Sequence, residues 1–305
     1  MTWFAEHRDD VSIVADDGRH HLAHHADVPR VLASTIKVVH LLAYTTAVAG
    51  GLDPAEPVRV GDWDAWHPFE GDGPVGAGAH LRALTSLGID CDEHGVARDP
   101  EQLVPLDTIA TAMISVSDNA APDYLRARLG DDALRAAAAS GGWPEPDMRW
   151  FCGETLRSYF PGEPDLTGRF TRDPGFRRDV LDRVRGEPIS AEAEWAWTQG
   201  TARGTASQLY AFHRHLATAG SPAVALARRK LGGTALFKGG ALPRSRGFGL
   251  SADGATIAMF YTGTGFPDVP LHTFGLAILS DLPAFAGDLG VRLRPGWATI
   301  EACEY

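Results

Sequence analysis

The sequence predicts an α/β protein of the α+β kind, with one antiparallel sheet built from both ends of the chain and flanked by helices. Two observations lead to this prediction. Patterns typical of strands occur at residues 11–14 and return at 234–280. Helical patterns dominate the stretch between them, from about residue 34 to 220. We therefore expect a mostly helical lobe beside the sheet.

The length of the chain bounds its domain organisation. With 305 residues the chain is long enough for one large domain or two small ones. We predict a single domain, residues 1–305, that has two lobes. The α/β lobe is expected to take about 1–45 and 205–305, and the helical lobe about 46–204.

The first expected element is a hairpin near the N-terminus. Residues 11–14 and 22–23 have the composition of strands. Asp16-Asp17-Gly18 lies between them and has the residue types of a turn.

A helix is expected next, beginning at Ser34. The apolar run that follows, up to Tyr44, lacks strict alternation, which favours a buried helix over a strand. Val38 and Val39 are poor helix formers, so burial must stabilise this segment. Lys37 lies three residues after Ser34 and shares its face of the helix.

Ser34 and Lys37 together form a candidate nucleophile and base. A neutral lysine beside the hydroxyl removes the serine proton, and a charged one stabilises negative charge on the oxygen. The N–H groups of the helix start favour an oxyanion at the same place. The plainer interpretation is a helix-capping serine followed by an ordinary lysine. A lysine within so apolar a run favours the functional interpretation, because buried lysines are rare.

The second polar motif is Ser117-Asp118-Asn119. It separates two stretches with helical character, 106–116 and 120–129. We expect a break here that exposes two polar side chains, with Pro122 near the start of the next helix. Simple capping between helices is the alternative, because Ser, Asp and Asn all favour cap positions.

The third motif, Lys238-Gly239-Gly240, is expected at the end of a strand. Two glycines let a substrate approach the backbone closely, and the lysine supplies a charge for a carboxylate or phosphate. A lysine before a glycine turn is the common alternative. The strands and the final helix expected in this region are 235–238, 248–251, 256–261, 274–279 and a helix over 282–289 that runs on toward Ala302.

The three motifs occur in the order S-x-x-K, S-D-N and K-x-G, and this set resembles the class A β-lactamase and penicillin-binding protein superfamily. The segment Gly204-Thr205-Ala206-Ser207-Gln208-Leu209 also resembles the threonine-rich start of a helix in that family. The resemblance covers about two thirds of the chain and is weak at 61–105 and 140–200. It implies a β-lactamase-like fold and a serine hydrolase.

Residue by residue, the resemblance implies a set of roles. Ser34 is the acylated nucleophile and Lys37 its proton acceptor. Ser117 relays the proton to the leaving group, and Asn119 orients the substrate and the lysine. Lys238 holds the anionic group of the substrate.

The glycine-rich strand has an implied role as well. The backbone N–H groups of Ser34 and Ala241 form the oxyanion hole, next to Gly240. The middle residue of the third motif is usually Thr or Ser in the family, whereas here it is Gly239. A substrate carboxylate is therefore expected to be bound less well than in a penicillin-binding relative.

The deacylating carboxylate also departs from the family pattern. Glu163, in Glu163-Pro164-Asp165-Leu166-Thr167, resembles the family's E-x-x-L-N, with Thr167 in place of Asn. Glu154 has a more usual spacing from Ser117 but lacks the motif. Both are surface carboxylates in the alternative interpretation. If neither activates water, the acyl-enzyme is hydrolysed slowly or passed to another acceptor.

Composition excludes several classes of partner. A net charge of −11 argues against nucleic acid, whose phosphates would be repelled. No stretch approaches the ~20 apolar residues that span a membrane. The first ten residues do not have the pattern of a signal peptide, and the three cysteines fit a reducing compartment, so a cytoplasmic protein is expected. The sequence leaves the oligomeric state open.

Two further segments have competing interpretations. His20, His21, His24 and His25 lack a cysteine or spaced carboxylate to complete a usual metal site, so we expect no metal and no cofactor. Residues 63–80, rich in aromatic residues and glycine, are either a substrate-facing loop beside Ser34 or an ordered surface loop.

The expected function is a serine hydrolase that acts on a small-molecule ester, amide or lactam through an acyl-enzyme at Ser34. A true class A β-lactamase that hydrolyses penicillins is one alternative. A biosynthetic acyltransferase and a non-catalytic ligand-binding protein on the same scaffold are the others.

Overall fold

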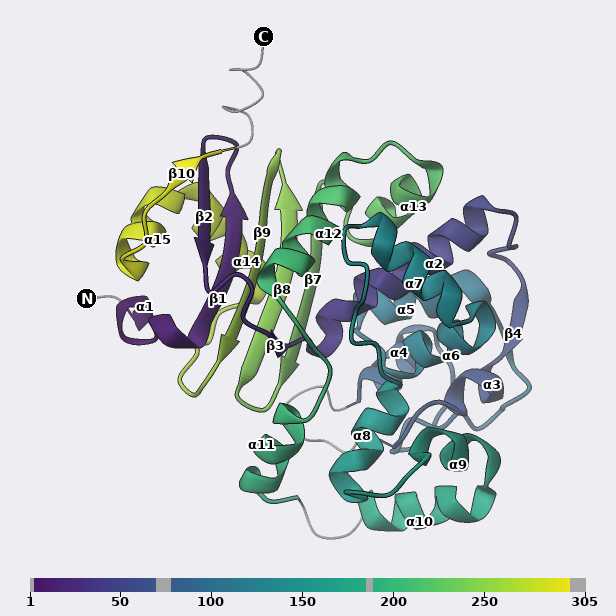
Figure 1. Ribbon diagram of the computed structural model, residues 1–305. Helices are drawn as coiled ribbons and strands as arrows, with labels where there is room; N and C mark the ends of the chain where they lie inside the picture. Colours follow the sequence, from purple (N-terminus) through teal and green to yellow (C-terminus); the bar gives the residue numbers. More distant parts are fainter. Residues whose placement is uncertain (1–2, 70–77, 185–188, 297–305) are drawn as a thin grey trace. The chain divides into compact units, whose positions relative to one another are not determined.

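The computed structural model describes residues 3–69, 78–184 and 189–296 of the chain (Figure 1). The chain divides into two compact units. The first unit comprises Met1–Val38, Arg135–Asp147 and Ala202–Tyr305, and the second comprises Val39–Leu134 and Met148–Thr201.

The first unit is built on a six-stranded sheet whose neighbouring strands are all antiparallel. The strand order is β10-β2-β1-β9-β8-β7, so strands from both ends of the chain lie side by side (Figure 1). Their bounds are β1 Val11–Asp16, β2 His20–His24, β7 Ala235–Leu242, β8 Ser245–Ala252, β9 Ala255–Thr262 and β10 Arg294–Pro295. The predicted α+β class is confirmed.

The predicted N-terminal hairpin is confirmed in β1 and β2. Ile13 lies opposite His24 and Asp16 lies opposite His21. The Asp16 carboxylate accepts a hydrogen bond from the Gly18 N–H at 2.8 Å. Gly18 has φ of 87°, a conformation that favours glycine.

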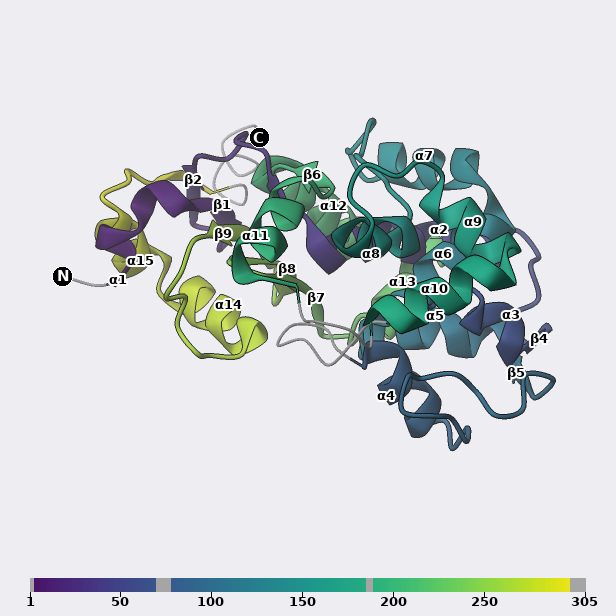
Figure 2. The same ribbon diagram turned by 90° about the horizontal axis from the view of Figure 1, so that it is seen from below.

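Helices cover both faces of this sheet (Figure 2). Phe248 and Leu250 on β8 lie against Gly275 of α14 (Leu271–Ser280). A Cβ on Gly249 would point to the opposite face of the sheet, where it would meet His213 of α12 (Ala206–Thr218). The period of two along a strand therefore gives β8 two buried faces. The remaining short elements of this unit are α1 Trp3–Glu6, η1 Arg8–Asp10, β3 Arg30–Val31, η2 Ala33–Ile36, β6 Arg203–Gly204, α13 Pro222–Lys230 and α15 Leu282–Leu289.

The predicted strand at 274–279 is wrong, because these residues belong to α14. A short apolar run is ambiguous between strand and helix, and only its packing partner decides between them. Here Phe274 contacts Phe4, Phe248 and Phe266. The apolar run therefore packs on the face of the sheet as a helix and does not pair with a strand at its edge.

The predicted helix over 282–289 is confirmed as α15. Its predicted extension toward Ala302 is wrong for residues 290–296, which are not helical. The helix ends at Leu289, and Gly290 caps it with φ of 65°; the chain then pairs with β2 as β10 (Arg294–Pro295). The rest of the predicted extension lies outside the described residues.

The second unit is mostly helical. Its one pair of strands in the described residues is β4 (Pro57–Arg59) with β5 (Leu103–Pro105). Its helices are α3 Val60–Asp64, α4 Ala79–Ser86, α5 Leu106–Ser115, α6 Ala120–Leu129, α8 Phe151–Tyr159, α9 Leu166–Arg172, α10 Pro174–Val184 and α11 Ala191–Gln199. Two more helices, α2 (Lys37–Ala49) and α7 (Asp131–Ser140), cross the boundary between the units. Among the described residues, no helix has both the length and the apolar character needed to cross a bilayer.

Candidate active site

Ser34 lies in a strained turn directly before a buried helix. The expected helix begins with a 3₁₀ turn, η2, and becomes α-helical at Lys37. Ala33, the residue before Ser34, has φ of 47°. A residue with a Cβ is uncommon in this conformation, and such strain is concentrated at functional sites. The turn leaves Ser34 half-buried at the start of α2.

Lys37 is fully buried and its Nζ lies 3.0 Å from Ser34 Oγ. The three-residue spacing brings the two side chains to one face, as the sequence predicts. A buried lysine amine within hydrogen-bond distance of a hydroxyl has the geometry of a base beside its nucleophile.

Strand β7 lies against the same turn. A Cβ added to Gly240 would lie 2.7 Å from Ser34 N and 2.9 Å from Thr35 N, both too short for any real contact. Only glycine therefore allows the strand backbone to approach the N–H groups of η2 this closely. Ala241, the next residue on β7, follows this point of closest approach.

Lys238 is the second buried lysine of this region. Its residue is 4% exposed, and its Nζ donates a hydrogen bond to Gly239 O at 2.9 Å. Burial, together with the nearby charge of Lys37, holds the pKa of Lys238 well below its usual range. Repulsion between two buried ammonium groups favours states in which one of them is neutral, and a neutral lysine is the form that accepts a proton.

Gly239 faces the other side of the strand. A Cβ there would meet Phe237 at 3.1 Å and Leu271 of α14 at 3.3 Å. The expectation that the strand ends at the two glycines is wrong, because β7 continues to Leu242. Pairing with β8 extends the ladder through both glycines, with Gly240 opposite Gly247.

In the second unit, the predicted break at Ser117-Asp118-Asn119 is confirmed. Residues 117–119 connect α5 to α6, and Ser117 has φ of 62°. Ser117 and Asn119 are half-buried, whereas Asp118 is fully buried. Ser117 and Asn119 therefore stay partly accessible, whereas the buried Asp118 side chain holds the turn in place.

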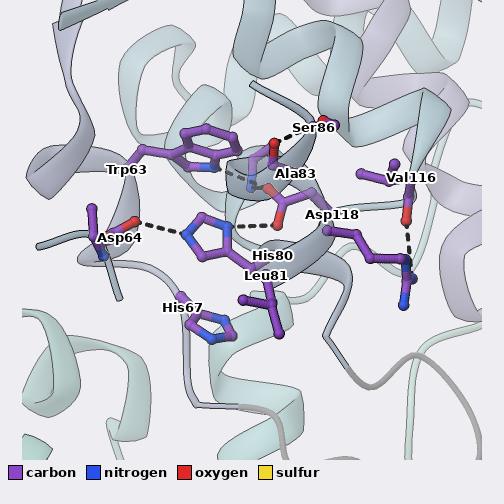
Figure 3. A network of polar contacts seen from close by, with 12 residues as sticks. Trp63, Asp64, His67, His80, Leu81, Ala83, Ser86, Val116 and Asp118 are labelled. Carbon is purple, nitrogen blue, oxygen red and sulfur yellow. Dashed lines mark hydrogen bonds and ion pairs between the residues drawn. The ribbon is translucent and has the colours of Figure 1, made fainter. Parts of the chain in front are cut away.

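Asp118 belongs to a buried polar network (Figure 3). Asp118 Oδ2 accepts hydrogen bonds from Trp63 Nε1 at 2.9 Å and from the Ala121 N–H at 2.7 Å. Asp118 Oδ1 lies 2.8 Å from His80 Nδ1, and His80 Nε2 lies 2.8 Å from Asp64 Oδ1. His80 therefore joins two buried carboxylates from α3 and from the turn before α6.

The charge state of His80 follows from these contacts. Burial by itself lowers its pKa, but the carboxylates of Asp118 and Asp64 outweigh burial and raise the pKa to about 9. His67 lies beside it, with ring centroids 4.5 Å apart. Burial and the charge of His80 lower the pKa of His67 to about 3, so His67 is neutral beside a charged histidine.

The sequence interpretation missed this network. The surface-loop interpretation of residues 63–80 does not account for the burial of Trp63, His67, Phe69 and His80. Residues 70–77 of that segment lie outside the described residues. A signal was present, because His80 shares a helix face with Ala83 and Leu84, both buried, and a histidine on an apolar face needs a partner.

The two candidate deacylating carboxylates are both engaged by arginines. Glu163 precedes α9, its side chain is 44% exposed, and it forms an ion pair with Arg169. The Glu154 side chain, on α8, is 12% exposed and pairs with Arg157 and with Arg149. The sequence suggested neither pairing.

No group of three or more metal-ligating side chains that could hold an ion occurs in the described parts of the chain. In β2, His24 Nε2 bonds Arg8 O at 2.8 Å and His20 Nδ1 bonds Asp17 at 3.0 Å. These two histidines of the N-terminal cluster therefore have protein partners.

Comparisons with known proteins assign the chain to a family. A model of the β-lactamase enzyme family matches residues 2–172. Among solved structures, a β-lactamase from Sphaerobacter thermophilus is 16% identical, with 92% of this chain and 91% of that chain covered and a TM-score of 0.55. A β-lactamase from Desulfarculus baarsii is 20% identical, with 93% and 94% covered and a TM-score of 0.51.

A variant of PBP-A, solved as an acyl-enzyme complex with penicillin G, is 15% identical, with 91% and 90% covered and a TM-score of 0.51. No curated protein matches the sequence. At these identities the solved structures establish the fold alone, a β-lactamase-like α/β fold. The family model covers more than half of the chain, and the chain belongs to the β-lactamase enzyme family.

Proposed function

We propose that this protein is a serine hydrolase that forms an acyl-enzyme at Ser34 with a small-molecule ester, amide or lactam. The observation that carries the proposal is the 3.0 Å separation of Lys37 Nζ and Ser34 Oγ at a strained turn. Membership of a family of β-lactamases and the order of the three motifs in the chain support it.

In the proposed acylation, neutral Lys37 takes the proton of Ser34 as Oγ attacks the carbonyl carbon. The new Oγ–C bond forms and the carbonyl oxygen becomes an oxyanion. The backbone N–H groups of Ser34 and Ala241 stabilise that charge, and each such donor contributes about 2.7–4 kcal/mol in related chemistry. The close approach of Gly240 to the Ser34 N–H supports this role for β7.

Collapse of the oxyanion breaks the bond to the leaving group. In this proposal Ser117 passes the proton to the leaving atom and Asn119 orients the substrate, as the family resemblance implies. An anionic group of the substrate beside Lys238 offsets the burial and the Lys37 charge that lower the pKa of Lys238, and the resulting ammonium holds that group. Water then hydrolyses the acyl-enzyme and regenerates Ser34.

Acyl transfer is the second candidate function. It requires an acyl-enzyme that water hydrolyses slowly, so that another acceptor takes the acyl group. Two observations favour it over efficient penicillin hydrolysis. The hydroxyl that helps the family bind a carboxylate is absent at Gly239. Glu163 and Glu154, the candidates for activating water, are both paired with arginines.

The intact mass of the protein after incubation with penicillin G tests the proposal, with Ser34→Ala as the control. An adduct of one penicillin that is absent in Ser34→Ala supports a working nucleophile. Persistence of that adduct favours the esterase or transferase, and rapid loss with penicillin consumption favours a true β-lactamase.

If no adduct forms, a panel of chromogenic short-chain esters comes next, again with the Ser34→Ala control. Turnover that depends on Ser34 supports the hydrolase with esters as substrates. Absence of both adduct and ester turnover would overturn the proposal in favour of a non-catalytic binding protein. Product analysis with an added amine or alcohol separates transfer from hydrolysis.

A further inference from the structure

The imidazole of His80 has a carboxylate oxygen at each nitrogen. Asp118 Oδ1 lies 2.8 Å from Nδ1 and Asp64 Oδ1 lies 2.8 Å from Nε2. A carboxylate only accepts hydrogen bonds, so both contacts are satisfied only when both ring nitrogens carry a proton. His80 and Asp118 are almost completely buried, and water does not compete for these contacts.

The second oxygen of each carboxylate also accepts hydrogen bonds. Asp64 Oδ2 accepts from the Ala97 N–H at 2.8 Å, and Asp118 Oδ2 accepts from Trp63 and Ala121. A buried network in which every member has its partners is rigid and specifies one arrangement. His80 links its two acidic ends directly, because each ring nitrogen lies 2.8 Å from one carboxylate oxygen.

In the described part of the chain, His67 and Arg177 are further titratable groups near His80. His67 lies beside it, with its ring tilted by 30°, and is neutral at pH 7 because burial and the charge of His80 lower its pKa to about 3. Arg177 of α10 donates to Asp64 O at 3.4 Å and adds positive charge to the region. The two carboxylates therefore dominate, and they raise the pKa of His80 to about 9.

The network reaches the Ser117 turn through Asp118. The Asp118 N–H bonds Ala112 O at the end of α5, and the Asp118 side chain caps α6 at Ala121. Ser117 adopts φ of 62°, a conformation that surrounding contacts must enforce. The contact from His80 holds the side chain that fixes this turn.

We propose that His80 is a positioning residue for the Ser117 turn, acting as an imidazolium held between Asp118 and Asp64. Its protonated ring orients the Asp118 carboxylate, and that carboxylate fixes the backbone that presents Ser117 and Asn119. The relevance of this device to acylation rests on the function proposed above, but the device itself is a property of the second unit.

Nuclear magnetic resonance of the full chain with labelled histidines and backbone amides tests the proposal without a substrate. We expect the His80 ring to stay doubly protonated at pH 7 and to titrate near pH 9. The amide signals of Ser117 and Asn119 should follow the same titration curve. A neutral His80 ring at pH 7, or amides that stay still while His80 titrates, would overturn the proposal.

Asp64→Asn is the decisive variant because it keeps the shape of the side chain and removes one charge. An asparagine amide has one acceptor where the carboxylate serves two donors, so the neutral imidazole becomes more favourable. We expect the His80 titration, and with it the Ser117 amide titration, to move down by about 1–3 pH units.

Asp123→Asn is the matched control. Asp123 is an equally buried carboxylate of the same unit, and it accepts from the Phe151 and Cys152 N–H groups rather than from His80. We expect it to leave the His80 titration in place. An equal shift in both variants would show a general loss of structure and contradict the proposal. If Asp64→Asn does not fold, the titration of the parent protein still decides.

The rate of penicillin G adduct formation between pH 6 and 10 connects the device to acylation. We expect its alkaline decline to follow the His80 titration and to move to lower pH in Asp64→Asn. A purely structural contact would lower the rate without moving the profile, and that result would overturn the link to Ser117. Absence of any adduct would count against the proposed function alone, because the titrations do not depend on it.

Discussion

At the scale of single residues, the first unit concentrates unfavourable features around Ser34. Ala33 has positive φ, Lys37 and Lys238 bury two amines near each other, and Gly240 allows a backbone approach that no other residue permits. A positive φ at a residue with a Cβ and the burial of an amine each cost stability. Their coincidence within one turn and one strand is the physical reason to regard this region as a site.

Replacing Lys37 tests the base. We expect Lys37→Ala to lower the rate of acylation of Ser34 by about 10²–10⁴-fold, the usual contribution of a general base. The far-ultraviolet circular dichroism should match the parent protein. Mass spectrometry of the penicillin G adduct over time measures the effect. An unchanged acylation rate would contradict the role of Lys37 as proton acceptor.

The neighbouring glycines of β7 offer a matched pair. In Gly240→Ala the new Cβ meets backbone atoms of η2 at 2.7 Å, so the turn or the strand must move. We expect a loss of about 1–3 kcal/mol of unfolding free energy and loss of acylation at Ser34.

Gly239→Ala should have a smaller effect on both. Its Cβ meets side-chain atoms of Phe237 and Leu271 at 3.1 and 3.3 Å, which yield more easily than backbone. Urea unfolding and adduct formation compare the two variants. Equal losses in both would show that the approach of Gly240 to Ser34 has no special importance.

At the scale of elements, α12 has a local signal at its start, whereas only tertiary contacts show that α14 is a helix. Helix α12 begins where the family resemblance implies, and Thr205 and Gln208 form a reciprocal capping box there. Helix α14 was predicted as a strand, because its apolar run has no such local signal. Capping chemistry is readable from neighbouring residues, whereas the choice for an apolar run depends on the surface it meets.

The cap of α12 yields a prediction. We expect Thr205→Ala to lower the free energy of unfolding by about 1 kcal/mol, because it removes the acceptor for the Gln208 N–H at 3.2 Å. Ser207→Ala, one position into the helix, is the control and should change stability much less. Chemical denaturation measures both. An effect of Ser207→Ala as large as that of Thr205→Ala would argue against the cap.

At the scale of the whole molecule, buried histidines occur in both units. His67 in the second unit and His213 in the first each have a pKa of about 3, in both cases because burial disfavours the charged ring. His80 has the opposite shift, to about 9, because two carboxylates outweigh burial. The three residues make the stability of the protein depend on pH in both directions.

The sign follows from proton linkage. His67 and His213 bind protons more weakly in the folded state, so the stability they contribute falls as pH drops below about 6.5. His80 binds its proton more strongly when folded, so its contribution is complete below about pH 6.5 and is lost as pH rises toward 9. We therefore expect maximal stability near pH 6.5, measured as thermal unfolding from pH 4 to 10.

His213→Leu isolates one part of this profile. In the described structure neither ring nitrogen of His213 has a hydrogen-bond partner, so the leucine loses no such contact. We expect the acid side of the profile to flatten while the alkaline side stays as in the parent protein. A variant with undiminished acid sensitivity would contradict the assignment.

The sequence by itself determined the α+β class, the terminal hairpin, the break at residues 117–119 and the pairing of Ser34 with Lys37. These features depend on turns, caps and spacings of a few residues, which the sequence displays directly. The tertiary structure alone decided that 274–279 is helical, that Gly240 meets η2, and that His80 joins Asp64 to Asp118. Those outcomes depend on groups far apart in the chain, and burial sets both their geometry and their charge.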